Sequence, residues 1–329
     1  MSMMSSIARY VPKYAFPLSL LGTIIGGTVL LKDWMRGKKY EGKEKVIGKT
    51  VIVTGANTGI GKETAKELAK RGARVILAGR NNEKCELARD EIIKETANRN
   101  VEARHLDLAS LQSIKEFAEE ICRTERHVDI LINNAGVMRC PKSLTTDGFE
   151  MQLGVNHLGH FYLTNLLLPK LKDSAPSRII TLSSLAHRRG EMNFSDLNSS
   201  SSYSPGGAYS QSKIANILFT VELAKRLEGT GVTALAVNPG IVDTELMRHL
   251  SIYKSTFSRI ILAPLRWIFL KTPNEGAQTS LYAALSKDLD GVSGKYLSNC
   301  AIEEASKEAR DEKAAERLWL ISEKWTRLK

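Results

Sequence analysis

The stretch Thr50-Val-Ile-Val-Thr-Gly-Ala-Asn-Thr-Gly-Ile-Gly61 decides the fold of this chain. Its first residues, 50–53, form an apolar run that is typical of a buried parallel strand. Three glycines follow with the spacing G-x-x-x-G-x-G, and residues 62–71 then have the apolar spacing of a helix. Glycines at such a turn let the backbone approach a pyrophosphate at the helix N-terminus. The stretch therefore predicts a nucleotide-binding strand–turn–helix unit.

Strand and helix patterns alternate from residue 46 to the end of the chain, which predicts an α/β fold. We expect a Rossmann-type, doubly wound parallel sheet in a single domain, residues 46–329, preceded by a separate segment, residues 1–45. The predicted strands are 50–54, 74–78, 101–106, 130–133, 178–183, 233–238 and 295–297. The predicted helices are 62–71, 83–96, 111–125, 148–171, 208–227, 275–286 and 303–326.

Composition excludes several classes of protein. The chain has 329 residues, 43% hydrophobic and 25% charged, as is usual for a globular enzyme. The net charge is +11, but the sequence contains no nucleic-acid-binding module. We therefore expect a membrane surface and a phosphorylated cofactor as the anionic partners, and we expect no nucleic-acid partner. The four cysteines lack C-x-x-C spacing, and His157 and His160 have no third ligand nearby. We therefore predict no disulfide framework and no metal site.

Residues 15–31, AFPLSLLGTIIGGTVLL, form an uncharged, mostly apolar run between basic flanks. The run is short for a membrane-spanning helix, and Pro17 weakens it further. It could be a signal anchor, a segment that lies in one leaflet, or a cleaved signal, although no clear cleavage site follows. We predict that residues 1–45, which include a basic linker, attach the protein to a membrane. Whether residues 15–31 span the membrane or lie on its surface stays open.

Tyr209 and Lys213 are four residues apart on a predicted helix and so share one face. An ammonium beside a phenol favours the phenolate and lowers the phenol pKa from about 10. We therefore expect Tyr209 to exchange a proton with a substrate near neutral pH.

The end of the second predicted strand, Ala78-Gly79-Arg80, carries cofactor information. An NAD site usually has an Asp or Glu at this position to bind the ribose 2′-hydroxyl. The chain has Arg80 instead, and a planar guanidinium can bind a 2′-phosphate. We therefore expect the cofactor pair NADPH/NADP+.

These motifs resemble the short-chain dehydrogenase/reductase family over most of residues 46–329. The shared motifs, in the family's order, are Thr54-Gly55-x-x-x-Gly59-x-Gly61, Asn133-Asn134-Ala135-Gly136, Asn156, Ser184, Tyr209-x-x-x-Lys213 and Pro239-Gly240. Within the family, the chain resembles the retinol dehydrogenases through residues 55–62, 105–108, 134–138, 156–160 and 183–187.

The resemblance implies roles for individual residues. Asn156, Ser184, Tyr209 and Lys213 would be catalytic, and the Ser184 hydroxyl would also orient the substrate oxygen. Asp107 would contact the adenine. The implied cofactor-binding residues are Thr54, Gly55, Asn57, Thr58, Gly59, Ile60, Gly61, Arg80, Asp107, Asn134, Gly136, Tyr209, Lys213, Pro239, Gly240 and Thr244.

The implied activity is the reversible, NADPH-dependent reduction of all-trans-retinaldehyde to retinol. Two alternatives stay open: a reductase of other lipid aldehydes or steroids, and a membrane-anchored scaffold that binds NADP(H) without turnover. The apolar stretch 256–270 is expected to cover the substrate pocket, either as a membrane interface or as a lid packed on the core.

Resemblance to one member of the retinol dehydrogenase group implies the mitochondrial inner membrane, on the intermembrane-space side. The cytosolic face of the endoplasmic reticulum membrane is the alternative. The first 14 residues contain Arg9, Lys13 and several serines but no acid, which favours the mitochondrion. A homodimer is left open.

Overall fold

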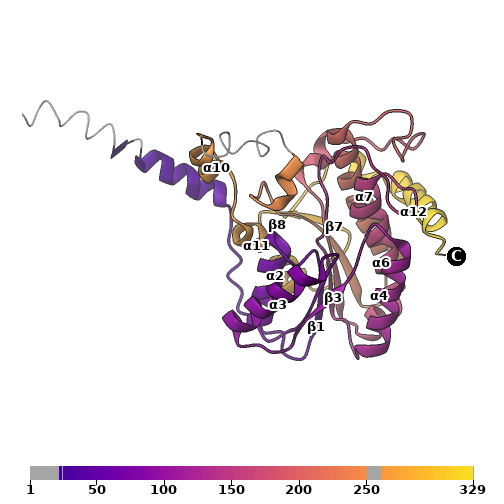
Figure 1. The fold of residues 1–329 in the computed structure, drawn as a ribbon, viewed down its shortest axis with the longest axis horizontal. Helices are drawn as coiled ribbons and strands as arrows, with labels where there is room; N and C mark the ends of the chain where they lie inside the picture. The colour runs from indigo at the N-terminus through magenta and orange to yellow at the C-terminus, as the bar shows by residue number, and fades with distance from the viewer. Residues whose placement is uncertain (1–21, 24, 250–260, 329) are drawn as a thin grey trace, which may run out of the picture.

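An eight-stranded sheet with the order β3-β2-β1-β4-β5-β6-β7-β8 forms the centre of the protein (Figure 1). The computed structural model describes residues 22, 23, 25–249 and 261–328. Strands β1 to β7 pair in parallel, and β8 pairs antiparallel with β7. The strands are β1 (Thr50–Thr54), β2 (Arg74–Gly79), β3 (Val101–His105), β4 (Ile130–Asn133), β5 (Ser177–Leu182), β6 (Val232–Asn238), β7 (Lys295–Ser298) and β8 (Ala301–Glu303).

Helices cover both faces of this sheet, because successive side chains of a strand point to opposite faces. Val51 and Val53 pack in one hydrophobic cluster with α2, α3 and α11, and Ile52 packs in a second cluster with α4, α6, α7 and α12 (Figure 1). The helices are α2 (Gly59–Lys70), α3 (Asn82–Thr96), α4 (Leu111–Thr124), α5 (Met151–Leu153), α6 (Gly159–Asp173), α7 (Pro205–Arg226), α10 (Ala263–Phe269), α11 (Pro273–Leu285) and α12 (Glu312–Thr326). Short helical turns are η1 (Gly154–Leu158), η2 (Leu185–Arg189), η3 (Glu245–His249), η4 (Lys287–Leu289) and η5 (Glu308–Arg310).

The structure confirms the predicted doubly wound sheet and corrects two helices. The predicted helix 148–171 is interrupted by the π-helical turn η1. The predicted helix 303–326 begins only at Glu312, where the Asp311 side chain accepts from the backbone N–H groups of Lys313 and Ala314. Residues 301–303 form β8 instead, because Asn299 and Cys300, both with positive φ, turn the chain back onto β7.

The segment before the sheet is helical from residue 22 to residue 36, residue 24 excepted, and it contacts the rest of the protein near its end. The Lys32 side chain, 4% exposed, donates to the carbonyl of Leu270 at 2.8 Å, and Arg36 pairs with Glu275 at 3.0 Å. Part of the apolar run 15–31 lies outside the described residues. Among the described residues, no helix has the length and apolarity needed to cross a bilayer.

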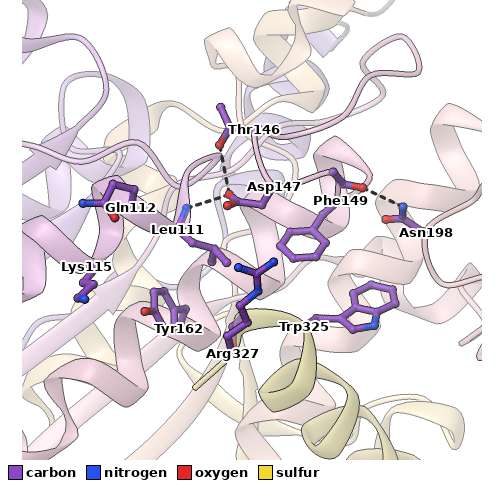
Figure 2. Close-up of a pocket in the computed structure, with 12 residues that line it drawn as sticks. Leu111, Gln112, Lys115, Thr146, Asp147, Phe149, Tyr162, Asn198, Trp325 and Arg327 are labelled. Carbon is purple, nitrogen blue, oxygen red and sulfur yellow. Dashed lines mark hydrogen bonds between the residues drawn. The ribbon is translucent and has the colours of Figure 1, made fainter. Parts of the chain in front are cut away.

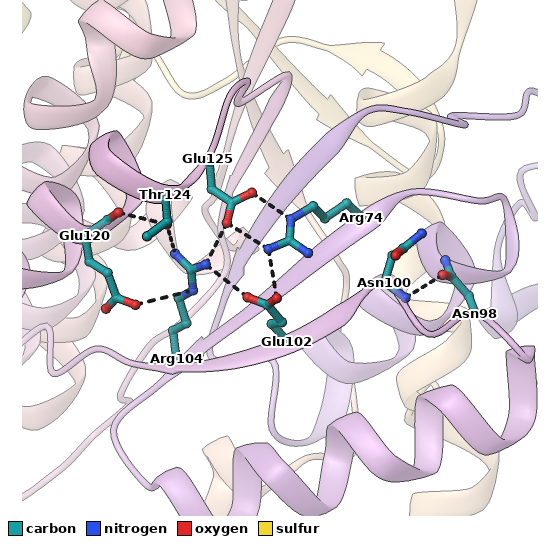
Figure 3. Close-up of polar contacts among 8 residues, drawn as sticks. All are labelled: Arg74, Asn98, Asn100, Glu102, Arg104, Glu120, Thr124 and Glu125. Carbon is teal, nitrogen blue, oxygen red and sulfur yellow. Dashed lines mark hydrogen bonds and ion pairs between the residues drawn. The ribbon is translucent and has the colours of Figure 1, made fainter.

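A partly buried ion-pair network joins β2, β3 and the end of α4 (Figure 3). The Glu125 carboxylate, 4% exposed, accepts from Arg74 Nε at 2.6 Å and from Arg104 Nη2 at 2.6 Å. Glu102 lies beside both guanidinium groups, at 2.9 Å from Arg74 and 3.0 Å from Arg104. The arginines hold the pKa of the Glu125 carboxyl below its usual range, Arg74 most strongly.

Glu125→Gln is expected to lower the free energy of unfolding at pH 7 by about 2 kcal/mol, because it removes charged hydrogen bonds and takes the most buried carboxylate away from two guanidinium groups. The folded-state pKa of Glu125 is depressed, so its contribution is present at neutral pH and is lost as pH falls below the usual carboxyl range. Urea unfolding at pH 7 and at low pH measures this. Glu119→Gln, which removes an exposed pair with Lys115, is the control. Equal losses in the two variants would contradict the prediction.

Candidate active site

A cavity of about 1180 Å³ lies at the carboxyl ends of the parallel strands. Its walls come from the loops that follow β1, β2, β3, β4, β5 and β6. Ligands of doubly wound sheets bind at this edge, because the loops of neighbouring strands diverge there. We call this cavity the main cleft. Most of the site residues predicted from the sequence line it, with the exceptions of Thr54 and Asn156.

The turn between β1 and α2 forms one end of the main cleft and fits a pyrophosphate. Gly55 has φ +64, and a Cβ there would lie 2.8 Å from the Cα of Ala135. A Cβ on Gly61 would lie 2.5 Å from the carbonyl oxygen of Gly55. The Thr58 side chain makes no capping hydrogen bond and the first turn of α2 has no acid, so the backbone amides and the positive helix end suit an anion.

Beyond this turn, the end of β2 carries the residues that would meet the adenosine half of a dinucleotide. Arg80 is exposed and lines the main cleft together with Lys84 and Asp107. A Cβ on Gly79 would lie 2.7 Å from the sulfur of Cys85, which explains the glycine before Arg80. Two cations beside the ribose side of such a site suit a 2′-phosphate.

The predicted proton-transfer residues meet at the other end of the main cleft. Tyr209, 7% exposed, comes from α7, and Ser184 directly precedes η2; both residues line the cleft. The Nζ of Lys213, one turn further along α7, lies 5.7 Å from the Tyr209 ring centroid and donates to the carbonyl of Leu182 at 3.0 Å. Phenol, hydroxyl and ammonium therefore surround one point of the cleft.

The protonation of these groups differs from the prediction. Burial raises the pKa of Tyr209 to about 12, and the hydrogen bond with Ser184 offsets only part of this. Burial also lowers the pKa of Lys213 to about 8. The expected lowering of the Tyr209 pKa is wrong for this structure, because desolvation outweighs an ammonium that is directed to a carbonyl. Tyr209 is thus a neutral phenol at pH 7, ready to donate a proton.

Asn156 lies behind the wall of the main cleft. Its side-chain oxygen accepts from Val137 N–H at 2.8 Å, and its amide donates to Val137 O and to Ser212 Oγ, both at 2.9 Å. The π-helical turn η1 gives Asn156 this position, and such turns are frequent at functional sites. A Cβ on Gly136 would lie 3.2 Å from the Asn156 oxygen, so the loop after β4 packs tightly here.

Thr54 also lies behind the wall, where it fixes the same loop. Its hydroxyl oxygen accepts from the backbone N–H groups of Asn134 and Ala135, both at 2.9 Å, and lies 2.9 Å from His160 Nε2. His160 Nδ1 in turn lies 3.0 Å from the carbonyl oxygen of Asn156. Burial lowers the pKa of His160 to about 4, so this histidine is a neutral link between the two residues. No sequence pattern predicts this link, although the pair His157 and His160 was a possible signal for it.

Residues 49–252 match the family model described as short chain dehydrogenase. The chain belongs to the short-chain dehydrogenase family. Retinol dehydrogenase 13 of Homo sapiens is 58% identical to it over 311 residues, which make up 94% of each chain.

Solved structures agree with this membership. An uncharacterized protein from Mycobacterium paratuberculosis has 40% sequence identity and a TM-score of 0.71, over 88% of this chain and 98% of that one. A structure from Escherichia coli, titled as a short chain dehydrogenase complexed with NADPH, has 26% identity and a TM-score of 0.63, over 78% of this chain and 99% of that one. This dehydrogenase is therefore an oxidoreductase with a nicotinamide cofactor.

The substrate end of the dehydrogenase contains residues that the sequence analysis did not single out. Apolar side chains of this end include Met138, Met151, Val155, Leu246 and Met247. No pattern marks them, because they come from the loop after β4, from α5 and η1, and from η3, which are apart in the sequence. The stretch 256–270 was expected to cover this end, but its described part, 261–270, does not line the cleft. Ile241, Val242 and residues 244–248 do so instead.

The dehydrogenase has a second cavity, of about 690 Å³, between α4, α6 and the end of α12 (Figure 2). The rings of Phe149 and Trp325 stack at 5.7 Å on one side. Asp147 is held by the Leu111 amide at 2.9 Å and by the Thr146 hydroxyl at 3.2 Å. None of the predicted catalytic residues lines this cavity, so we place the active site in the main cleft. Among the described residues, no cluster of His, Cys, Asp and Glu could hold a metal ion.

Proposed function

We propose that this dehydrogenase reduces lipophilic aldehydes with NADPH, with all-trans-retinaldehyde as the leading substrate and retinol as the product. The observation that carries the proposal is the convergence of Tyr209, Ser184 and Lys213 beside an apolar substrate end of the main cleft. The name of the human relative, retinol dehydrogenase 13, supports a retinoid. Arg80 and Lys84 support the phosphorylated cofactor.

A bound nicotinamide supplies the hydride in this reaction. The chain's own residues manage the carbonyl oxygen, on which negative charge develops. The Tyr209 phenol donates a proton to that oxygen, and the Ser184 hydroxyl donates a hydrogen bond to it. The Lys213 ammonium, protonated below about pH 8, adds a positive charge beside the same point.

Turnover of purified, detergent-solubilised enzyme tests this function. NADPH oxidation is followed with all-trans-retinaldehyde, with decanal and with a ketosteroid, and NADH is the matched cofactor control. Reduction of retinaldehyde with NADPH in preference to NADH supports the proposal. Reduction of decanal or the steroid alone favours the reductase of other lipid carbonyls. NADPH binding without turnover of any of the three favours the non-catalytic scaffold.

We further propose that the protein acts at a membrane surface, in the mitochondrial inner membrane rather than the endoplasmic reticulum. Leu30 and Trp34 of the N-terminal helix and Trp267 of α10 are exposed apolar side chains, which suit an interface. Lys38, Lys39 and other exposed lysines follow this helix and suit anionic lipid. Flotation with anionic vesicles tests the membrane, cell fractionation tests the compartment, and light scattering tests whether the protein forms a homodimer.

A further inference from the structure

Four arginines, Arg139, Arg188, Arg189 and Arg248, line the main cleft near its reacting end. They come from three places in the chain: the loop after β4, the end of η2, and η3. All four are exposed, so their guanidinium groups reach water while they border the cleft. We call these four residues the arginine rim.

Contacts place the arginine rim close to the proposed chemistry. The Arg139 guanidinium lies 3.1 Å from where a Cβ on Gly206 would stand, one turn of α7 before Tyr209. Arg188 and Arg189 end η2, the short turn that begins immediately after Ser184.

Arg248 approaches the rim from the other side of the cleft. It belongs to η3, and it lines the main cleft as Arg139 does. Arg139 and Arg248 therefore border the same cleft.

Backbone carbonyls, rather than carboxylates, accept from two of the rim arginines. Arg188 donates to the carbonyl of Glu304 at 3.0 Å and Arg248 to the carbonyl of Glu245 at 3.2 Å. Within the described part of the chain, none of the four arginines forms an ion pair. Other arginines do find a partner, as Arg178 does with Asp290 at 2.5 Å.

The remaining acids do not neutralise this end of the cleft. The acidic residues of the lining are Asp107, at the adenosine end, and Glu245, which pairs with Lys84 at 3.6 Å. The segments that the structure does not describe, 1–21 and 250–260, contain no Asp or Glu in the sequence. A concentration of one charge around an apolar cleft raises the local concentration of the opposite charge.

We propose that the main cleft accepts, beside neutral lipophilic aldehydes, acidic ones, and favours them over neutral aldehydes of the same chain length: these have an apolar chain whose far end carries a carboxylate or phosphate that binds the arginine rim. This deepens the proposed function and rests on it. The reaction is unchanged: hydride goes to the carbonyl carbon, the Tyr209 proton goes to the oxygen, and the products are an alcohol and the oxidised cofactor. Guanidinium groups suit such anions because they bind two oxygens at once.

A matched pair of substrates tests the proposal. Decanal and the ω-oxo acid of the same chain length differ only in the terminal carboxylate. The oxo acid is expected to have a kcat/KM about tenfold above that of decanal, as one charged hydrogen bond provides. Added salt should reduce this ratio, since the rim is exposed. Equal values for the two substrates, insensitive to salt, would overturn the proposal.

Variants assign the preference to the rim. In the double variant Arg188→Gln, Arg189→Gln, and separately in Arg139→Gln, the ratio should fall toward one. Arg99→Gln is the control, because Arg99 is exposed just before β3, at the opposite end of the strands. A ratio that survives in all rim variants, or that falls equally in Arg99→Gln, rejects the rim as its source.

Two further arms complete the design. A phospholipid that carries the same oxo acyl chain, presented in vesicles, tests whether the anion comes from a lipid headgroup or from a free acid. Calorimetric titration of the NADPH-loaded protein with decanoate and with decanol measures how much a terminal carboxylate adds to the binding affinity in the absence of turnover. If neither aldehyde is reduced but decanoate binds more tightly than decanol, the proposed function fails while the rim stands. Equal binding of both would overturn the rim itself.

Discussion

Tyr209→Phe is expected to lower kcat for aldehyde reduction by about a hundredfold or more, while KM for NADPH changes little. The substitution removes the one hydroxyl that can protonate the carbonyl oxygen and keeps the ring that fills the site. Steady-state kinetics with retinaldehyde and NADPH measure both constants. Tyr282→Phe is the control, since Tyr282 lies on α11 and packs against Tyr40, outside the main cleft. Activity of Tyr209→Phe close to that of the native enzyme would reject the mechanism.

Tyr209 and Lys213 set the pH dependence of the reaction. Tyr209 has a pKa of about 12 and so stays protonated through the neutral range, which favours reduction. Lys213 has a pKa of about 8, so the ammonium beside it is present below pH 8 and is lost above it. We expect reduction to slow as pH rises through about 8, and alcohol oxidation, which needs a base, to speed up. A reduction rate that rises with pH across this range contradicts the assignment.

Arg80→Glu is expected to raise KM for NADPH about a hundredfold and to leave NADH as the better cofactor. The variant replaces the cation at the end of β2 by a carboxylate, which repels a 2′-phosphate and accepts from a 2′-hydroxyl. A loss of this size corresponds to breaking one close charge pair in a binding site. The ratio of kcat/KM for the two cofactors is the measurement.

Arg99→Glu serves as the charge-matched control for this variant, because it introduces the same carboxylate far from the cleft. A cofactor ratio that is the same in native enzyme and Arg80→Glu would remove Arg80 from the cofactor site. It would leave the pyrophosphate turn untouched, because that turn binds through glycine backbone and a helix end.

Much of this fold follows from local sequence patterns. Strands β1 and β4 begin and end at the predicted residues, because both are apolar runs bounded by polar or glycine residues. The glycine turn, the end of β2 and the pair Tyr209 and Lys213 were visible for the same reason. Each is a short pattern whose meaning does not depend on distant residues.

The rest depends on contacts that no local pattern records. The π-helical turn η1 forms where Asn156 reaches Val137 and Ser212, and a hydrophobic helix pattern runs straight through it. β8 requires Cys300 in a left-handed conformation that cysteine rarely adopts. The pKa of Tyr209 depends on burial, which outweighs the lysine that the sequence places beside it. The arginine rim joins three loops that are far apart in the chain.

The N-terminal helix has a bearing on how this enzyme should be handled. Lys32 holds the carbonyl of Leu270, and the next residue, Lys271, donates its backbone N–H to Ile241 O at 2.8 Å and accepts from Asp243 N–H at 2.9 Å. Ile241 lines the main cleft. A protease, or a truncation chosen to improve solubility, could remove the residues up to 36. The contact between Lys32 and Leu270 would then be lost. Kinetic constants from such a trimmed enzyme would describe a cleft whose wall has lost a support, so the full-length protein is the proper reference.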